Sequence, residues 1–341
     1  MDFYIGSYTR LGGPGVGICH LEGNQLSLQA SDFLPNATYV ILNRAENRLF
    51  AVCNETVAGE AGTSLASYAV EGRKLTRLSR CDGKGIGPCH LCLSPDERFL
   101  YAANYHSGTI SVFALDERGI IEMLVDHVVH EGHSINPLRQ AGPHVHQVSF
   151  LPGTNLLCAV DLGLDQVILY EQNPETGLLT KHSATEIVPG MGPRHVVHGE
   201  NGFTYLTCEM GNHVAVLRFN GEGFDVIQYL PTLPADFREE STTAAIRMTA
   251  DGKKVLVSNR GHDSLAVFSV GGDGLLTPAG IYSTGDRNPR DFNLLGDGRV
   301  LIAHQEGDLV LSRWTRQGLE VLQRLDVTAA VCVTLPRGEQ G

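Results

Sequence analysis

The chain has 341 residues, including 39 glycines and 15 prolines, and its 38 acidic and 26 basic residues give a net charge of −12. The acidic balance and the lack of a Lys/Arg stripe argue against nucleic acid as a partner. No apolar run approaches the roughly 20 residues that span a bilayer, so no membrane partner is expected either. The length allows two domains or one large repeat fold.

The chain starts directly in strand-like sequence, the run FYIGSYT, without the basic and apolar stretches of a secretory signal. Several of the eight cysteines stand inside apolar runs, as Cys53, Cys158 and Cys208 do, which is typical of free thiols in a reducing compartment. We therefore expect a cytoplasmic protein. Cys89 and Cys92 form one Cys-x-x-Cys, but no second pair completes a zinc site.

Short apolar runs separated by Gly/Asp/Asn turns recur along the whole chain, and no segment shows a sustained helical period. After the first run, the copies of one pattern lie at 37–55, from Pro88, from Pro143, from Pro193, at 244–276 and from Pro289. Each copy reads as strand, tight turn, strand, short loop, strand, with a weaker fourth strand near the next copy.

A column of polar residues ends the second strand of each copy. Its members are Ser7, Asn54, Asn104, Asp161, Cys208, Asn259 and His304. Their intervals of 45 to 57 residues fit the about 40 to 50 residues of a four-stranded propeller blade. We predict an all-β fold, a seven-bladed β-propeller with four-stranded antiparallel blades. A β-sandwich is the alternative, because it also uses turn-rich antiparallel repeats.

The two ends of the chain complete each other in this prediction. The first run has no strand before it, and the C-terminal run Ala330–Leu335 has no blade of its own. We expect this run to supply the innermost strand of the first blade, which closes the ring and removes two open sheet edges. Residues 1–341 would then form a single domain.

Propeller geometry brings the start of each innermost strand and the end of each second strand to one channel mouth. The chemistry-bearing residues predicted there are Glu55, Asn104, His144, His146, Arg194, His195, Glu209, Arg260 and Arg290. An arginine presents a planar fork suited to carboxylate or phosphate, and a histidine or glutamate beside it can activate water. The mouth is therefore predicted to bind a small anionic substrate.

These residues also have structural interpretations. Arg194 and Arg290 could form ion pairs that tie blades together. Asn104 and Asp161 end strands beside glycine-containing loops and could cap turns.

Three histidines, His127, His130 and His133, are spaced by three in the longest insertion between copies. Their order is His-Glu-x-His, not the His-Glu-x-x-His of a zinc helix. We expect this insertion to be a loop that covers the mouth, with no metal and no cofactor; a cation held by carbonyls and waters is the alternative. No Gly-x-Ser-x-Gly elbow and no Walker motif occurs, which disfavours covalent catalysis by serine.

The strings RQAGPHVHQV, DLGLDQV, VPGMGPRH, SNRGHDSLAVF and GDRNPRDF resemble the motifs of the seven-bladed propeller lactonase family, and the likeness spans nearly the whole chain. The family includes propeller-type 6-phosphogluconolactonases and, more distantly, fungal muconate cyclases, in which a histidine, two arginines and a glutamate surround the channel. The resemblance carries these roles to His146, Arg194, Glu209 and Arg260, which the column had already placed at one mouth.

The resemblance implies a lactonase that hydrolyses a sugar lactone, with 6-phosphogluconolactone as the first candidate. Arg194 and Arg260 would hold the phosphate or stabilise the oxyanion, and His146, with Glu209, would deprotonate water. Supporting contacts to the substrate are expected from His144, His195, Arg290, Asn104 and Glu55. A lactonising muconate-type cycloisomerase and a non-catalytic binding platform are the alternatives. A monomer or a weak homo-oligomer is expected.

Overall fold

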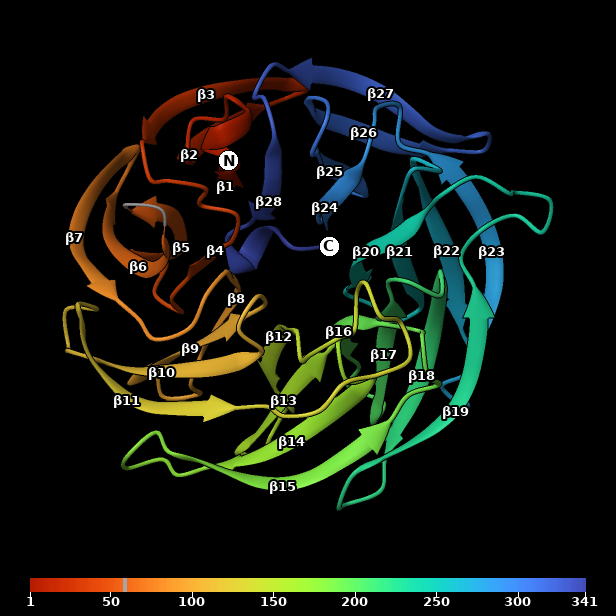
Figure 1. Ribbon diagram of the computed structural model, residues 1–341. Coiled ribbons are helices and arrows are strands. Elements are labelled where there is room, and N and C mark those ends of the chain that lie inside the picture. Colours follow the sequence, from red (N-terminus) through yellow and green to blue (C-terminus); the bar gives the residue numbers. More distant parts are fainter. Residues whose placement is uncertain (58–59) are drawn as a thin grey trace.

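The computed structural model describes residues 1–57 and 60–341, and within them the side chains of residues 1–55 and 64–341. The described strands form seven four-stranded antiparallel sheets, arranged as blades around a central axis (Figure 1). The structure is thus the seven-bladed β-propeller that the repeat predicted. No helix in the described residues has the length and hydropathy to cross a membrane.

The blades, each given from its innermost strand outward, have the following bounds. Blade 1 is β28 (Ala330–Thr334), β1 (Asp2–Ser7), β2 (Val16–Glu22) and β3 (Gln25–Asp32). Blade 2 is β4 (Val40–Leu42), β5 (Arg48–Val57), β6 (Glu60–Glu71) and β7 (Lys74–Asp82). Blade 3 is β8 (Pro88–Leu93), β9 (Phe99–Asn104), β10 (Thr109–Leu115) and β11 (Ile121–Val129). Blade 4 is β12 (Val145–Phe150), β13 (Leu156–Asp161), β14 (Gln166–Gln172) and β15 (Leu179–Glu186).

Blade 5 is β16 (Pro193–His198), β17 (Phe203–Cys208), β18 (His213–Phe219) and β19 (Phe224–Pro231). Blade 6 is β20 (Thr242–Met248), β21 (Lys254–Arg260), β22 (Ser264–Val270) and β23 (Leu276–Ser283). Blade 7 is β24 (Pro289–Leu294), β25 (Arg299–His304), β26 (Leu309–Thr315) and β27 (Gly318–Leu325). Two short 3₁₀ turns, η1 (Thr9–Leu11) and η2 (Arg337–Glu339), complete the described elements.

The C-terminal strand closes the ring. β28 pairs antiparallel with β1, with Tyr4 opposite Thr334 and Ile5 opposite Val333. On the side of blade 7, the Asn293 side chain donates a 2.9 Å hydrogen bond to the Val333 carbonyl. The closure predicted from the two incomplete ends of the sequence is confirmed.

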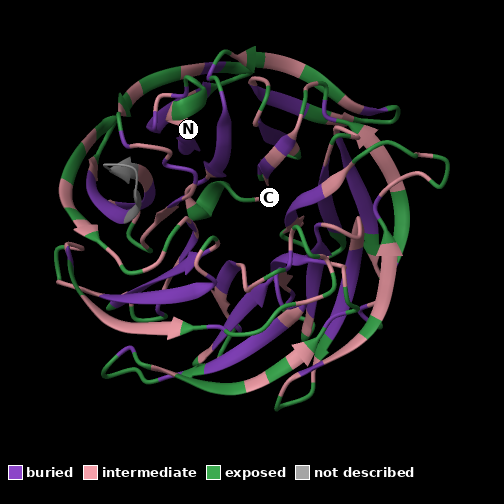
Figure 2. Cartoon of the chain, viewed as in Figure 1, coloured by how far each residue is buried: buried purple, intermediate pink, exposed green. Residues whose placement is uncertain are grey.

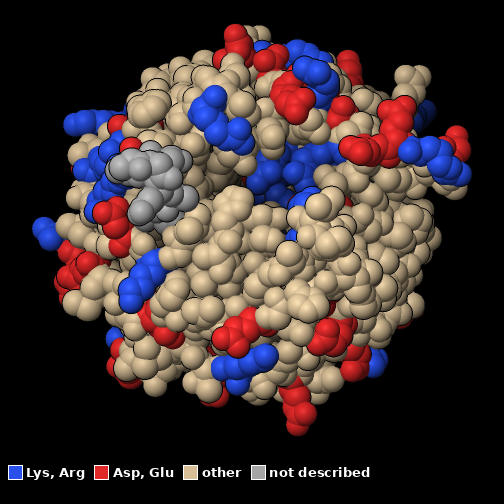
Figure 3. All heavy atoms as spheres, in the orientation of Figure 1, with Lys and Arg blue, Asp and Glu red and all other residues tan. Residues whose placement is uncertain are grey.

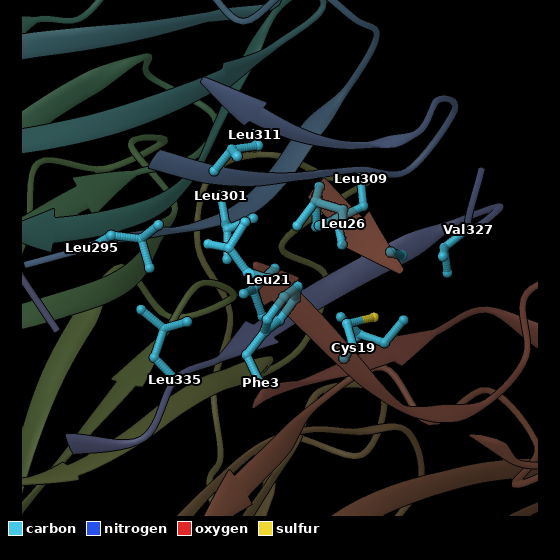
Figure 4. Close-up of a cluster of buried hydrophobic side chains, with 14 residues drawn as sticks. Phe3, Cys19, Leu21, Leu26, Leu295, Leu301, Leu309, Leu311, Val327 and Leu335 are labelled. Atoms are coloured by element: carbon cyan, nitrogen blue, oxygen red, sulfur yellow. The ribbon is translucent and has the colours of Figure 1, made fainter. Parts of the chain in front are cut away.

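The core lies between neighbouring blades, because the second and third strands are covered on both faces. Figure 2 shows the buried residues concentrated in the inner strands, whereas the outermost strands alternate in exposure. Between blades 1 and 7, the buried side chains of Phe3, Cys19, Leu301, Leu311 and Leu335 pack into one cluster (Figure 4). Each fully buried large apolar side chain contributes about 1.5–3 kcal/mol, so every blade interface stabilises the ring.

The turn before the third strand has the same backbone form in several blades. Gly108, Asp165, Asn212 and Asp263 all have φ between 52° and 62°. Glycine takes this left-handed conformation freely, and Asn or Asp tolerates it better than other residues do. In these four blades, the turn residue therefore fixes where the second strand stops, which is the end that faces the channel mouth.

Candidate active site

A cavity of about 460 Å³ opens at the mouth of the channel. Figure 3 shows Lys and Arg atoms gathered inside the central hollow of this face. The lining residues that carry a titratable side chain are Tyr8, Arg10, Glu55, Cys89, Tyr105, His106, Arg139, His146, Glu209, Arg260 and Arg290. They come from blades on all sides of the axis, so the ring itself assembles the site.

Glu209 lies at the centre of this site, directly after β17. Its Oε1 is 2.7 Å from Arg139 Nη2, and its Oε2 is 2.9 Å from Arg194 Nε and 3.0 Å from Arg260 Nη2. Only 6% of the Glu209 side chain is exposed. Burial by itself raises the pKa of this carboxyl, but Arg260 and Arg194 outweigh it and hold the pKa well below the usual range. Glu209 is therefore ionised, and it organises three guanidinium groups.

The positive charges of the guanidinium groups around Glu209 outnumber its one negative charge. Arg194 is buried, and burial followed by the charges of Arg260 and Arg290 lowers its pKa to about 9. Arg290 lines the same cavity, and within the described residues no carboxylate lies within 4.0 Å of it. Such a cluster of cations favours an additional anion in the cavity.

His146, on β12, supplies a neutral imidazole beside this cluster. Burial, followed by the charge of Arg194, lowers its pKa well below 6.5. Its ring meets the rings of His195 and Tyr105 edge to face, with centroids 5.0 and 5.4 Å away. A neutral imidazole in a cavity with cationic walls can accept a proton from water and return it.

Cys89 also lines the cavity, with its Sγ 3.3 Å from the carbonyl oxygen of His146. Burial raises the pKa of the Cys89 thiol to about 12. It is thus a thiol at neutral pH and is unsuited to act as a nucleophile.

Arg139 is a residue of the site that the sequence reasoning missed. Its Nη2 donates to Glu209 Oε1 at 2.7 Å and lies 3.3 Å from the Tyr105 hydroxyl. It belongs to the insertion after β11, which Figure 1 shows crossing over the inner strands toward the axis. The sequence pointed to this residue only indirectly, because the insertion that contains Arg139 was expected to cover the mouth.

Asp165 connects two segments of the site. Its Oδ2 accepts hydrogen bonds from the Ser134 hydroxyl at 2.6 Å, Gln140 Nε2 at 2.6 Å and Gly190 N at 2.7 Å, and its Oδ1 accepts one from Gly192 N at 2.6 Å. Gln140 follows Arg139 directly, and Gly192 stands two residues before Arg194. One buried carboxylate therefore fixes the loops that carry both arginines.

The predicted supporting residues divide into two groups. Glu55 and Arg290 line the cavity, with Glu55 paired to Arg80. His195 does not line it and lies behind His146, with Nδ1 3.3 Å from Arg194 Nη1.

His144 and Asn104 differ from the prediction, because neither lines the cavity. The ring of His144 stacks on Tyr105 at 4.4 Å, with its Nδ1 2.8 Å from the Tyr105 carbonyl oxygen. Asn104 is fully buried, and its Nδ2 donates to Thr109 Oγ1 at 3.1 Å and Ser111 Oγ at 3.0 Å. Asn104 thus joins β9 to β10, which is the structural interpretation that the sequence left open.

The three spaced histidines point to different partners. His130 Nδ1 lies 2.6 Å from Asp161 Oδ2, and its Nε2 lies 2.9 Å from the Tyr170 hydroxyl. His127 Nδ1 lies 3.3 Å from Ser111 Oγ. Among the described side chains, those of residues 1–55 and 64–341, no group of three or more His, Cys, Asp or Glu is arranged to hold a metal ion.

Comparisons with known proteins cover nearly the whole chain. The family model described as "Lactonase, 7-bladed beta-propeller" matches residues 2–334. A 6-phosphogluconolactonase of Bacillus subtilis is 35% identical over 318 residues, which cover 90% of this chain and 89% of that protein. A crystal structure of a Lactobacillus plantarum protein matches with a TM-score of 0.90 and 30% identity over 98% of both chains. The periplasmic gluconolactonase of Pseudomonas aeruginosa matches with a TM-score of 0.90 and 26% identity, over 97% of this chain and 98% of that one.

Proposed function

Because the chain belongs to the seven-bladed β-propeller lactonase family, we propose that it hydrolyses 6-phosphogluconolactone to 6-phosphogluconate. Lactone hydrolysis follows from the family. Among the similar proteins, that of B. subtilis is a 6-phosphogluconolactonase and that of P. aeruginosa a gluconolactonase. The choice between a phosphorylated and an unphosphorylated sugar therefore has to come from the site.

The excess of cations in the cavity is the observation that carries this choice. Four arginines line the cavity, Arg10, Arg139, Arg260 and Arg290. Of its two lining carboxylates, Glu55 is paired with Arg80, and Glu209 is shared by Arg139, Arg260 and the buried Arg194. A neutral lactone would leave this charge uncompensated, whereas a phosphate supplies about 1.5 to 2 negative charges. The cavity volume of about 460 Å³ lies within the range of small-molecule sites.

The proposed reaction needs one proton shuttle and one oxyanion site. Neutral His146 accepts a proton from a water molecule while the water oxygen bonds to the lactone carbonyl carbon. Arg194 and Arg260 stabilise the negative charge that develops on the carbonyl oxygen. The tetrahedral intermediate then collapses, the ring C–O bond breaks, and the imidazolium returns its proton to the ring oxygen. His146 is neutral again at the end of the cycle.

Glu209 has a supporting role in this proposal. Its depressed pKa and its three arginine partners make it a poor base. It keeps the guanidinium groups of Arg194 and Arg260 in place, so their donors are already oriented when the oxyanion forms.

The test measures the rate of lactone hydrolysis from the protons that the reaction releases, and the rate of spontaneous hydrolysis is subtracted. His146→Ala is expected to lower kcat by about 10²–10⁴-fold, and Arg260→Gln by about 10²-fold or more. His182→Ala, which removes an exposed histidine on β15, serves as the matched control. Wild-type rates in both site variants would overturn the assignment of these roles.

We also propose a cytoplasmic location and hydrolysis without a cofactor. All eight cysteines are free, as expected of a protein from a reducing compartment. Fractionation of the producing cells would check the location, and activity after chelator treatment would check the chemistry.

A further inference from the structure

Two arginines at the cavity mouth share one aromatic ring and form no ion pair with Glu209. We call Glu209 and its three ion-pair partners, Arg139, Arg194 and Arg260, the Glu209 cluster. Arg10 Cζ lies 4.5 Å and Arg290 Cζ 5.7 Å from the centroid of the Tyr8 ring. All three residues line the cavity. We call these three residues the Tyr8 subsite.

The backbone holds the exposed member of this subsite in place. Arg10 is in η1, the 3₁₀ turn that follows β1, and its backbone N–H donates to Asn36 Oδ1 at 3.1 Å. The backbone N–H of Asn36 in turn donates to the Thr9 hydroxyl at 3.0 Å. The Arg10 side chain therefore starts from a fixed point at the rim, and the Tyr8 ring supports its guanidinium.

The cations of the Tyr8 subsite lack carboxylate partners. Within the described part of the chain, no ion pair within 4.0 Å involves Arg10 or Arg290. Both carboxylates of the cavity lining are engaged elsewhere, Glu55 with Arg80 and Glu209 with its own arginines. The contact of Arg290 Nη1 with Gln305 Oε1 is long, at 3.4 Å.

Depth distinguishes the rim residue Arg10 from the floor of the cavity. Arg194, Glu209 and His146 are buried, Arg139, Arg260 and Arg290 are half-buried, and Arg10 is exposed. A phosphate is strongly hydrated, so a site near solvent binds it with less desolvation than the buried floor would require. The carbonyl carbon of a lactone, in contrast, reacts best in the water-poor region beside His146.

We propose that Arg10 and Arg290, supported by Tyr8, bind the phosphate of the substrate, while the Glu209 cluster and His146 act on the lactone carbonyl. Arg10 then determines the preference for phosphorylated over unphosphorylated sugar lactones. This inference rests on the proposed lactonase function and adds which end of the substrate meets which cations.

The experiment compares kcat/KM for 6-phosphogluconolactone and for gluconolactone in four proteins: wild type, Arg10→Ala, Arg10→Lys and Arg118→Ala. Arg118 is an exposed arginine outside the cavity, paired with Asp116, so its removal makes the same change in net charge. In Arg10→Ala, the ratio of the two kcat/KM values is expected to fall about tenfold, the worth of one charge-assisted hydrogen bond. Arg10→Lys should restore part of the ratio, because the charge remains and the planar fork is lost.

Calorimetric binding of 6-phosphogluconate and of gluconate gives a readout that is independent of turnover. Weaker binding of 6-phosphogluconate alone in Arg10→Ala supports the inference. If Arg10→Ala lowers kcat/KM equally for both lactones, or lowers neither, the ratio is unchanged. This result overturns the inference and leaves the proposed lactonase function standing. A wild-type protein that neither hydrolyses the phosphorylated lactone nor binds 6-phosphogluconate overturns the proposed function as well.

Discussion

The substitution Glu209→Gln tests whether the carboxylate at the centre of the mouth holds the arginines together. Gln has nearly the same shape, so the change removes one charge and leaves the packing. Three guanidinium groups lie within 3.0 Å of this carboxylate, and its side chain is 6% exposed. Removal of one partner from a buried ion pair costs about 3–5 kcal/mol, because the remaining charges stay buried without compensation.

The pH dependence follows from the depressed pKa of Glu209. In the unfolded chain, a glutamate titrates near pH 4.3, and in the folded protein the arginines hold the pKa well below that value. Its contribution to stability is therefore fully present above about pH 4.3 and is lost as the pH falls toward the folded pKa. The difference in unfolding free energy between wild type and Glu209→Gln should be constant from neutral pH to about pH 5 and shrink below pH 4.

Urea unfolding followed by circular dichroism measures this difference, and Glu55→Gln is the matched control. Glu55 lines the same cavity, but its side chain is 34% exposed and pairs with the equally exposed Arg80. Its neutralisation should cost less than about 1 kcal/mol. Inorganic phosphate should stabilise Glu209→Gln more than Glu55→Gln, because the anion replaces the missing charge. Equal stabilities for Glu209→Gln and wild type would refute the reasoning.

Three further predictions follow from the structure. Because burial and Arg194 keep the pKa of His146 well below 6.5, kcat/KM for gluconolactone, which has no titrating phosphate, should show no decline centred near pH 6.5; such a decline in initial rates would contradict this. Asp165→Asn should lower the unfolding free energy by about 2 kcal/mol or more and also lower kcat/KM, since two site loops bond to this carboxylate; wild-type kcat/KM in initial-rate assays would speak against the anchoring role. Val333→Asp should lower the free energy of unfolding by about 3 kcal/mol or more, as measured by thermal or urea unfolding. Val321→Asp, on the exposed face of β27, should lower it little. Similar effects of the two substitutions would argue against β28 as the closing strand.

The fold was predictable because its information is local and repeated. Each copy carries its own strand, turn and strand signals, and seven polar strand ends at nearly regular intervals define seven blades. The strand lengths were less well predicted. β5 continues to Val57, three residues beyond Asn54, where the column placed its end. The β5–β6 pairing extends past the repeat, and a pattern common to all copies does not report such an extension of one hairpin.

The site was predictable only where it follows the repeat. His146, Glu209 and Arg260 stand at strand starts and strand ends, and all three line the cavity. The same positional argument failed for Asn104, because a residue at a strand end can turn toward the next strand of its own blade instead of the channel. Arg139 was missed because its loop has no counterpart in the other copies, so no column includes it.

The charge of the molecule is separated in a way that bears on catalysis. The net charge is −12, and Figure 3 shows acidic and basic side chains interspersed around the outer edge of this face, with basic ones gathered in the central hollow. Screening over about 8 Å at physiological ionic strength keeps the outer acids from cancelling the inner cations. Within the described residues, Arg10 and Arg290 have no carboxylate within 4.0 Å, and Arg139, Arg194 and Arg260 share the one carboxylate of Glu209, so these cations are under-compensated in the free protein. In the transition state, the negative charge that develops on the lactone carbonyl oxygen compensates these cations more than the neutral carbonyl does in the ground state. This difference between the two states is what accelerates a reaction.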